Sequence, residues 1–179
     1  MSKHYNVGLY LGRFQPLHIG HECIIQRMLR ECDKVIIAIG SAQESGTVRN
    51  PLSCLLRRRL IEETFWPHLD RLIIIPIHDR EHYSDDSSWG DYLFEQIRER
   101  TGLTPDVVYE GDESTNKNWY DNLNVDAIKI PRSTIRISGT ELRLRILNDD
   151  FDIVRTFLPK PIYKYYYEIR KEIQNAKIN

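Results

Sequence analysis

The sequence predicts an α/β fold: a Rossmann-like, doubly wound parallel sheet of about five strands with a C-terminal helical segment. Short apolar runs alternate along the chain with segments whose apolar residues recur at helical spacing. The run 34–40 is apolar on both faces, which is typical of a strand inside a parallel sheet. Strands separated by helices in this way are joined by βαβ crossovers, so we expect helices on both faces of the sheet.

The strands are expected in the apolar runs 7–11, 34–40, 72–77, 106–110 and 125–131. The helices are expected at Ile24–Cys32, Leu52–Phe65, Ser87–Thr101, Gly139–Leu147 and Ile162–Ile173. Asn50-Pro51 predicts the start of the second helix, because asparagine is a good N-cap and proline is favoured at the first helical position. Gly102 predicts the end of the third helix.

The length of the chain indicates a single domain over residues 1–179. With 179 residues and 41% hydrophobic content, the chain can bury a core of its own. We expect the Rossmann-like core over about 7–135, and a phosphate-binding motif with C-terminal helices over about 136–179.

The net charge and the cysteine content indicate which binding partners and which cellular compartment to expect. A net charge of −1 gives no sign of a polycation, so neither nucleic acid nor a membrane is an expected partner. Cys23, Cys32 and Cys54 lack metal-type spacing and fit small buried residues in a reducing compartment. No targeting segment is visible, and no apolar run approaches the roughly 20 residues that cross a bilayer. A cytoplasmic protein is therefore expected.

The most informative segment is 12–21, Gly-Arg-Phe-Gln-Pro-Leu-His-Ile-Gly-His, which joins the first strand to a helix. His18 and His21 are three residues apart, so both rings can face one side of the first helical turn. Gly20 removes a side chain where a phosphate could approach the helix N-terminus, and Arg13 adds a permanent positive charge. Two histidines at this spacing alone are more often a metal pair or surface residues beside a cap. The complete segment predicts a polyphosphate site.

A second segment, 137–143, reads Ile-Ser-Gly-Thr-Glu-Leu-Arg. It could bind a phosphate in the same way, at the start of a helix. Ser138 and Thr140 offer hydroxyl groups at a helix start, and Arg143 lies one turn further on, where it could reach a phosphate. A capping box between Ser138 and Glu141 is the plainer interpretation. Both can hold, because the cap orients the helix that binds the anion.

Other features are less specific. The loops 41–49 and 78–87 follow strands at the carboxyl edge, where open α/β sheets bind ligands. The triplet Arg57-Arg58-Arg59 is interpreted as a solvated helix face, and Trp66 and Trp119 as core or surface residues.

Together the two motifs resemble those of the nucleotidylyltransferase superfamily, and most of all the archaeal-type nicotinamide mononucleotide (NMN) adenylyltransferases. The likeness runs from about Val7 to Pro161. Shorter matches support it at Gly40-Ser41-Ala42-Gln43, Arg49-Asn50-Pro51, Ile75-Pro76-Ile77-His78-Asp79 with Trp89, and Tyr109-Glu110-Gly111-Asp112. The chain departs from the family pattern at 54–57, where relatives have Ala-Gly-Glu-Arg, and at 113–119. The loop between Asp79 and Trp89 is closer in length to bacterial members fused to a Nudix hydrolase domain.

The resemblance implies an ATP site and an acceptor site. The residues implied around the ATP phosphates are His18, His21, Arg13 and Arg143. Further ATP contacts are implied for Gly12, Phe14, Gln15, Gly20, Gly111, Asp112, Ser138, Gly139 and Thr140. The nicotinamide nucleotide is implied to contact Ser41, Gln43, Arg49, Asp79 and Trp89. From the residues alone, Asp79 could instead cap a turn, and Trp89 could pack within its own domain.

The implied reaction is in-line attack by the NMN phosphate on the α-phosphorus of ATP, giving NAD and pyrophosphate without a covalent intermediate. Mg²⁺ is expected, held mainly by the ATP phosphates, and no protein metal site is predicted. The resemblance also implies a homo-oligomer, because relatives often assemble. The alternatives are another small-molecule nucleotidyl transfer, such as pantetheine-phosphate adenylylation or cytidylylation, and a nucleotide-sensing module without turnover. Asp79 gives a preference for the amide over the acid form of the acceptor, because a carboxylate repels another carboxylate.

Overall fold

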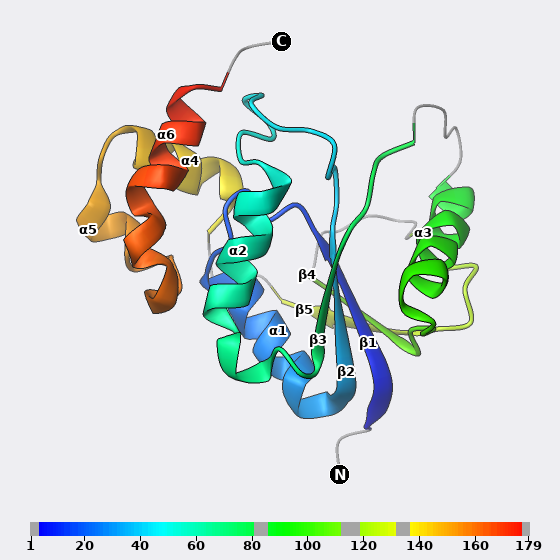
Figure 1. The fold of residues 1–179 in the computed structure, drawn as a ribbon. Helices are drawn as coiled ribbons and strands as arrows, with labels where there is room; N and C mark the ends of the chain where they lie inside the picture. The colour runs from blue at the N-terminus through cyan, green and yellow to red at the C-terminus, as the bar shows by residue number, and fades with distance from the viewer. Residues whose placement is uncertain (1–3, 81–85, 112–118, 132–136, 177–179) are drawn as a thin grey trace.

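The computed structural model describes residues 4–80, 86–111, 119–131 and 137–176. Within these ranges, five parallel strands form one sheet in the order β3-β2-β1-β4-β5 (Figure 1). The strands are β1 (Tyr5–Gly12), β2 (Cys32–Ile39), β3 (Leu72–Pro76), β4 (Val107–Gly111) and β5 (Asp126–Ile130). The strand order reverses at β1, and this reversal is where doubly wound sheets form their ligand crevice. The predicted fold class is confirmed.

The helices lie on both faces of the sheet, with α1 and α2 on one face and α3 on the other (Figure 1). Helices α4, α5 and α6 gather beside α2 at the far side from α3. The helices are α1 (Ile19–Glu31), α2 (Cys54–Thr64), α3 (Asp86–Thr101), α4 (Gly139–Leu147), α5 (Phe151–Val154) and α6 (Tyr166–Gln174). The described residues also include the 3₁₀ helices η1 (Trp66–His68) and η3 (Lys160–Tyr165). No helix in the described ranges is both long and apolar enough to cross a bilayer.

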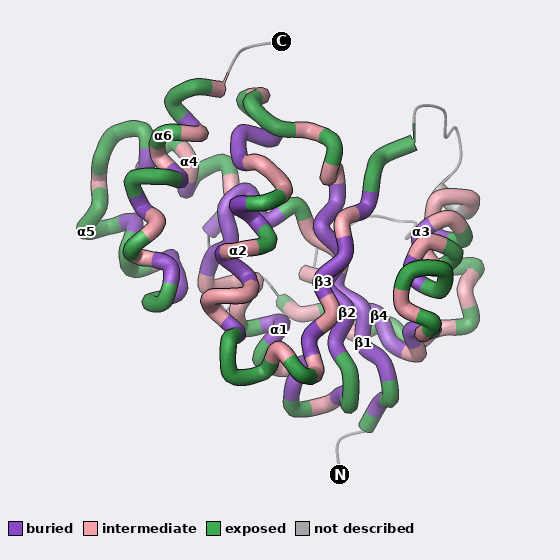
Figure 2. The backbone as a smooth tube through the Cα atoms, in the orientation of Figure 1, coloured by how far each residue is buried: buried purple, intermediate pink, exposed green. Residues whose placement is uncertain are grey.

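Each face of the sheet has its own apolar core, because successive side chains of a strand point to opposite faces. Ile36 and Ala38 of β2 pack in a cluster with Leu93 of α3. Val35 and Ile37 of the same strand pack in the larger cluster with α1, α2 and the C-terminal helices. The central strands are therefore buried along most of their length, as Figure 2 shows. This explains why the run 34–40 is apolar on both faces.

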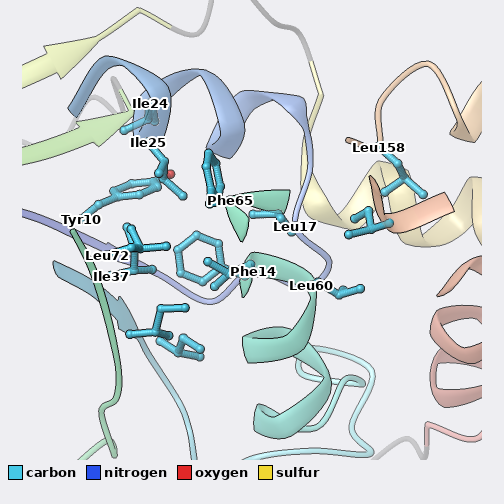
Figure 3. Packing of buried hydrophobic residues seen from close by; sticks show 14 of the residues in the cluster. Tyr10, Phe14, Leu17, Ile24, Ile25, Ile37, Leu60, Phe65, Leu72 and Leu158 are labelled. Carbon is cyan, nitrogen blue, oxygen red and sulfur yellow. The ribbon is translucent and has the colours of Figure 1, made fainter. Parts of the chain in front are cut away.

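The turn after β1 is anchored in the larger core. Figure 3 shows Phe14 and Leu17 among the buried side chains there, near Tyr10 and Phe65. Phe14 and Tyr10 meet edge to face with ring centroids 5.7 Å apart. Phe14 also has a positive φ of 51°, so the backbone bends sharply at this point. The buried side chains of Phe14 and Leu17 thus anchor the turn after β1 in the core.

Helix α2 does not begin where the sequence predicted. The N-cap is Ser53, whose hydroxyl accepts the backbone N–H of Leu56 at 3.3 Å. Asn50 is buried instead, with its side-chain amide donating to Glu44 and its backbone N–H donating to Thr47 Oγ1. Asn50-Pro51 therefore closes the preceding loop, and the serine cap comes three residues later.

The C-terminal segment is more broken than expected. The single helix predicted at Ile162–Ile173 is η3 followed by α6, and the short α5 was not predicted. Pro161 has no backbone N–H to donate and sits in the first turn of η3. The three cysteines are free; Cys32 is buried, but Cys23 is exposed and corrects the expectation that all three are core residues.

Candidate active site

A cavity of about 750 Å³ opens at the carboxyl edge of the sheet, beside the point where the strand order reverses. Its walls come from the turn after β1, the first turns of α1 and α4, and the residues that follow β2, β4 and β5. Of the expected site residues, it is lined by Gly12, Arg13, Phe14, Gln15, His18, Gly20, His21, Ser41, Asp79, Trp89, Gly111, Ser138, Gly139, Thr140 and Arg143. Gln43 and Arg49 are not among the lining residues, and Asp112 lies outside the described residues. Segments far apart in sequence thus converge on one cavity.

His18 and His21 form a capping box at the start of α1. His18 Nδ1 accepts the backbone N–H of Gly20 at 3.1 Å, and His21 Nδ1 accepts the backbone N–H of His18 at 3.2 Å. The two rings stack with centroids 3.7 Å apart. Because each Nδ1 is an acceptor, the neutral form of each ring carries its proton on Nε2. The cap therefore makes both rings hydrogen-bond donors through Nε2, at a helix N-terminus that already favours anions.

Arg143, one turn into α4, joins the second motif to the first. Its Nη1 donates to the carbonyl oxygen of Gln15 at 2.8 Å, and its Nη2 donates to Thr140 Oγ1 at 3.2 Å. A Cβ atom on Gly139 would lie 3.2 Å from the same Gln15 oxygen, so a glycine lets the start of α4 approach the turn after β1. Ser138 caps this helix by accepting the backbone N–H of Glu141. The serine N-cap is thus confirmed, whereas the Glu141 side chain accepts from Arg145 at 3.0 Å and does not complete a reciprocal capping box with Ser138.

Gln15 lines the cavity, and its side chain is bonded to the main chain of Leu52. Its amide nitrogen donates to the Leu52 carbonyl at 3.1 Å, and its amide oxygen accepts the Leu52 N–H at 2.8 Å. This pair ties the turn after β1 to the segment before α2. Gln15 is buried, so the two bonds are shielded from water.

The cavity carries concentrated positive charge. Burial, followed by repulsion from Arg49, lowers the pKa of Arg13, and burial with repulsion from Arg13 lowers the pKa of Arg143. Guanidinium groups remain charged at neutral pH despite such shifts. A bound polyanion would relieve the repulsion among them. Arg49 therefore acts on Arg13 electrostatically although it does not line the cavity.

The lining of the cavity also includes aromatic and acidic side chains. Trp89 of α3 and Trp119 meet edge to face with ring centroids 5.7 Å apart, and both line the cavity with Asp79. A Cβ atom on Gly90 would lie 2.3 Å from the Trp119 carbonyl oxygen, so Gly90 allows the Trp119 segment to cross α3 closely. Trp119 packs against the apolar core beneath α3, as expected, and its place in the cavity lining was not predicted. Its position after β4, at the carboxyl edge, is the signal that could have indicated a site role.

Asp79 is clamped by Gln43. Gln43 Nε2 donates to Asp79 Oδ2 at 3.2 Å, and the Asp79 backbone N–H donates to Gln43 Oε1 at 3.0 Å. The two bonds connect the loop after β2 to the segment after β3. Gln43 therefore orients a lining carboxylate.

No group of three or more histidine, cysteine, aspartate or glutamate side chains suited to a metal ion occurs among the residues that the structure describes.

A parallel α/β sheet with two helix N-termini, histidine donors and arginines converging on one crevice defines a nucleotide-binding protein of the nucleotidyltransferase class. The chain belongs to the cytidylyltransferase-like family, whose model matches residues 9–145.

Its relatives agree on a narrower activity. A nicotinamide-nucleotide adenylyltransferase from Saccharolobus solfataricus is 33% identical over 175 residues, covering 91% of each chain. One from Methanoculleus marisnigri is 41% identical over 151 residues, covering 80% of each. In the solved structure of a bifunctional NMN adenylyltransferase/ADP-ribose pyrophosphatase from Francisella tularensis, the fold recurs with a TM-score of 0.76 at 24% identity. That match covers 95% of this chain and 50% of the Francisella chain.

Proposed function

We propose that the protein transfers the adenylyl group of ATP to NMN, giving NAD and pyrophosphate. The observation that carries the proposal is the composition of one cavity: its lining combines cationic and N–H donor groups with acidic and aromatic side chains. The cationic and N–H donor groups suit a polyphosphate, and the acidic and aromatic side chains suit a flat carboxamide-bearing base. The names of the relatives support the same reaction.

The proposed chemistry is one in-line displacement. A phosphate oxygen of NMN forms a bond to the α-phosphorus of ATP, and the bond to the bridging oxygen breaks so that pyrophosphate leaves with the electron pair. His18 and His21 donate through Nε2 to oxygens that gain charge, and Arg13 and Arg143 neutralise them. No protein nucleophile is required. Mg²⁺ enters with ATP as part of the substrate and shields its phosphate charge.

Alignment of ATP with NMN provides a further part of the rate acceleration. Two anions repel each other in water, and holding them in reactive geometry removes much of that barrier. We assign ATP to the part of the lining formed by α1 and α4, and NMN to the part formed by Asp79, Trp89 and Trp119. This assignment rests on the donors in the first part and the indole rings in the second.

The native Cys23 thiol can report on ATP binding, because it is exposed and lines the cavity. Partial desolvation of the sulfur against the cavity wall, with Glu22 nearby, raises the pKa of Cys23, so its alkylation should be slow at pH 7 and faster as the pH rises toward 9. Saturating MgATP is expected to slow this alkylation at least about tenfold, measured by mass spectrometry of the labelled peptide. Cys54 provides an internal control, since its labelling should not respond to ATP. Equal Cys23 labelling with and without ATP would place the nucleotide elsewhere.

Asp79 is expected to set the preference between acceptors. A carboxylate accepts from the NMN carboxamide and repels the carboxylate of nicotinic acid mononucleotide. Asp79→Asn should therefore reduce the ratio of kcat/KM values for NMN over the acid form by about tenfold. The measurement compares both acceptors, with phosphopantetheine as a third, in wild type and variant. An unchanged ratio would exclude Asp79 from base recognition, and a wild type that prefers phosphopantetheine would favour the alternative transferase.

A further inference from the structure

Arg57 is a fully buried arginine in the first turns of α2. The sequence indicated a solvated face for the triplet it begins, and this expectation is wrong for Arg57. Its neighbour Arg58 is exposed and pairs with Glu62 at 2.7 Å, as expected of a surface residue. The difference arises because Arg57 points at two loops, whose positions no local pattern reveals.

The Arg57 guanidinium is bonded to main-chain carbonyl oxygens of those two loops. Nη1 donates to the Arg13 oxygen at 3.1 Å and to the Gly40 oxygen at 2.8 Å. Nη2 donates to the Ser41 oxygen at 3.1 Å and to the Glu44 oxygen at 3.4 Å. The Arg13 oxygen belongs to the turn after β1, and the other oxygens belong to the loop after β2. One side chain thus holds both loops at fixed separation.

These loops carry different halves of the site. The turn after β1 presents Arg13 and leads to the histidine cap of α1. The loop after β2 presents Ser41 to the cavity, carries Gln43, which clamps Asp79, and ends near Arg49. A change in the separation of these loops would change the distance between the ATP phosphate and the NMN phosphate in the proposed reaction.

Burial of this arginine is not explained by stability alone. Within the described part of the chain, Arg57 forms no salt bridge, and its Nε has no hydrogen-bond partner. A buried cation without a carboxylate partner is unfavourable compared with an apolar side chain of similar size. Burial also lowers the pKa of Arg57. The compensating gain is geometric, since a planar fork with several donors can bridge carbonyls that an apolar side chain cannot.

We propose that Arg57 is a positioning residue that sets the spacing between the ATP half and the NMN half of the site. The proposal rests on the proposed adenylyl transfer, in which both phosphates must be in line. A displacement of about 1 Å in such an arrangement can lower turnover about a hundredfold. Arg57 acts through the two loops and does not itself contact the substrates.

The test compares Arg57→Met, Arg57→Lys and the control Arg58→Met, the last of which changes an exposed arginine on the same helix. The first readout is steady-state kinetics with ATP and NMN, with rates referred to the folded fraction. Arg57→Met should lower kcat about a hundredfold, and Arg57→Lys less, because one ammonium can bond only part of the carbonyl set. Arg58→Met should match wild type.

The second readout is binding, which does not depend on turnover. ATP occupies one half of the site, whereas NAD is a covalently joined ligand that spans both. Titration calorimetry should therefore show that Arg57→Met weakens NAD about tenfold or more while ATP affinity changes by less than about threefold. Arg57→Lys should show the same pattern with smaller amplitude, which preserves the test if Arg57→Met folds poorly.

The outcomes separate the two proposals. Wild type that forms no NAD contradicts adenylyl transfer to NMN, whatever the variants do. Wild type that is active, with Arg57 variants whose kcat and NAD affinity per folded molecule are unchanged, overturns the positioning role. Equal weakening of ATP and NAD would also overturn it, because the effect would then be general loosening of the fold.

Discussion

Replacement of His21 by alanine is expected to lower kcat by about a hundredfold to a thousandfold, with a much smaller change in ATP affinity. His21 Nδ1 is occupied by the backbone N–H of His18, so its ring donates from Nε2 at the mouth of a helix N-terminus. A donor aimed at oxygens that gain charge contributes most in the transition state. Initial rates at varied ATP, combined with ATP titration in the absence of acceptor, measure both quantities.

A matched variant separates catalysis from capping. Glutamate at this position can still accept the His18 N–H, as in an ordinary capping box, but its carboxylate has no proton to donate. His21→Glu should therefore keep the thermal stability of the wild type and be as inactive as His21→Ala. If either variant turns over at the wild-type rate, His21 is a structural residue only.

Replacement of Trp89 by alanine is expected to raise the KM for NMN by about tenfold to a hundredfold, because stacking of a base on an aromatic ring contributes about 1–3 kcal/mol. Trp89 and Trp119 stand at a steep angle to one another, with 72° between their planes, and so form two walls of one pocket. The KM for ATP should change little, because the ATP contacts that we propose lie on the turn after β1 and on the first turns of α1 and α4. Kinetics with each substrate varied in turn measure the two constants.

Trp66→Ala is the control for this experiment. Trp66 has 73% of its surface exposed in η1 and is not among the lining residues of the cavity. It should leave both KM values unchanged. A rise in the KM for ATP with the KM for NMN unchanged in Trp89→Ala would reverse the assignment and place adenine between the indoles.

The sheet was predictable because its signals are local. A buried parallel strand is apolar on both faces, and the continuous apolar runs of β2 and β3 indicate strands of this kind. The helix starts that carry function were also local: the first helical turn of α1 and the serine cap of α4 each fit within a few residues of sequence. The convergence of these two helices at one edge follows from the parallel topology.

What escaped prediction depends on contacts between distant segments. Asn50 and Ser53 are both good N-caps, and only the burial of Asn50 against Glu44 decides between them. Arg57 looks like its exposed neighbours in sequence, yet it reaches carbonyl groups 13 to 44 residues away. Gln43 was expected to contact the nucleotide, and its bond to Asp79, 36 residues further along the chain, was not predicted.

The position of Trp119 in the cavity lining was not predictable for another reason. A single tryptophan in a polar stretch carries no periodicity, and its partner Trp89 lies on another element. Such a residue is placed by the close crossing at Gly90, which only the three-dimensional structure reveals.

The most direct test of the account follows the oxygen atoms of the acceptor. Wild-type protein is incubated with MgATP and with NMN labelled with ¹⁸O in the non-bridging oxygens of its phosphate. The masses of the products are then measured by mass spectrometry. In-line attack of the NMN phosphate on the α-phosphorus of ATP predicts NAD that retains every labelled oxygen, together with an equal amount of unlabelled pyrophosphate. Absence of NAD, or label in the pyrophosphate, would contradict the proposed reaction.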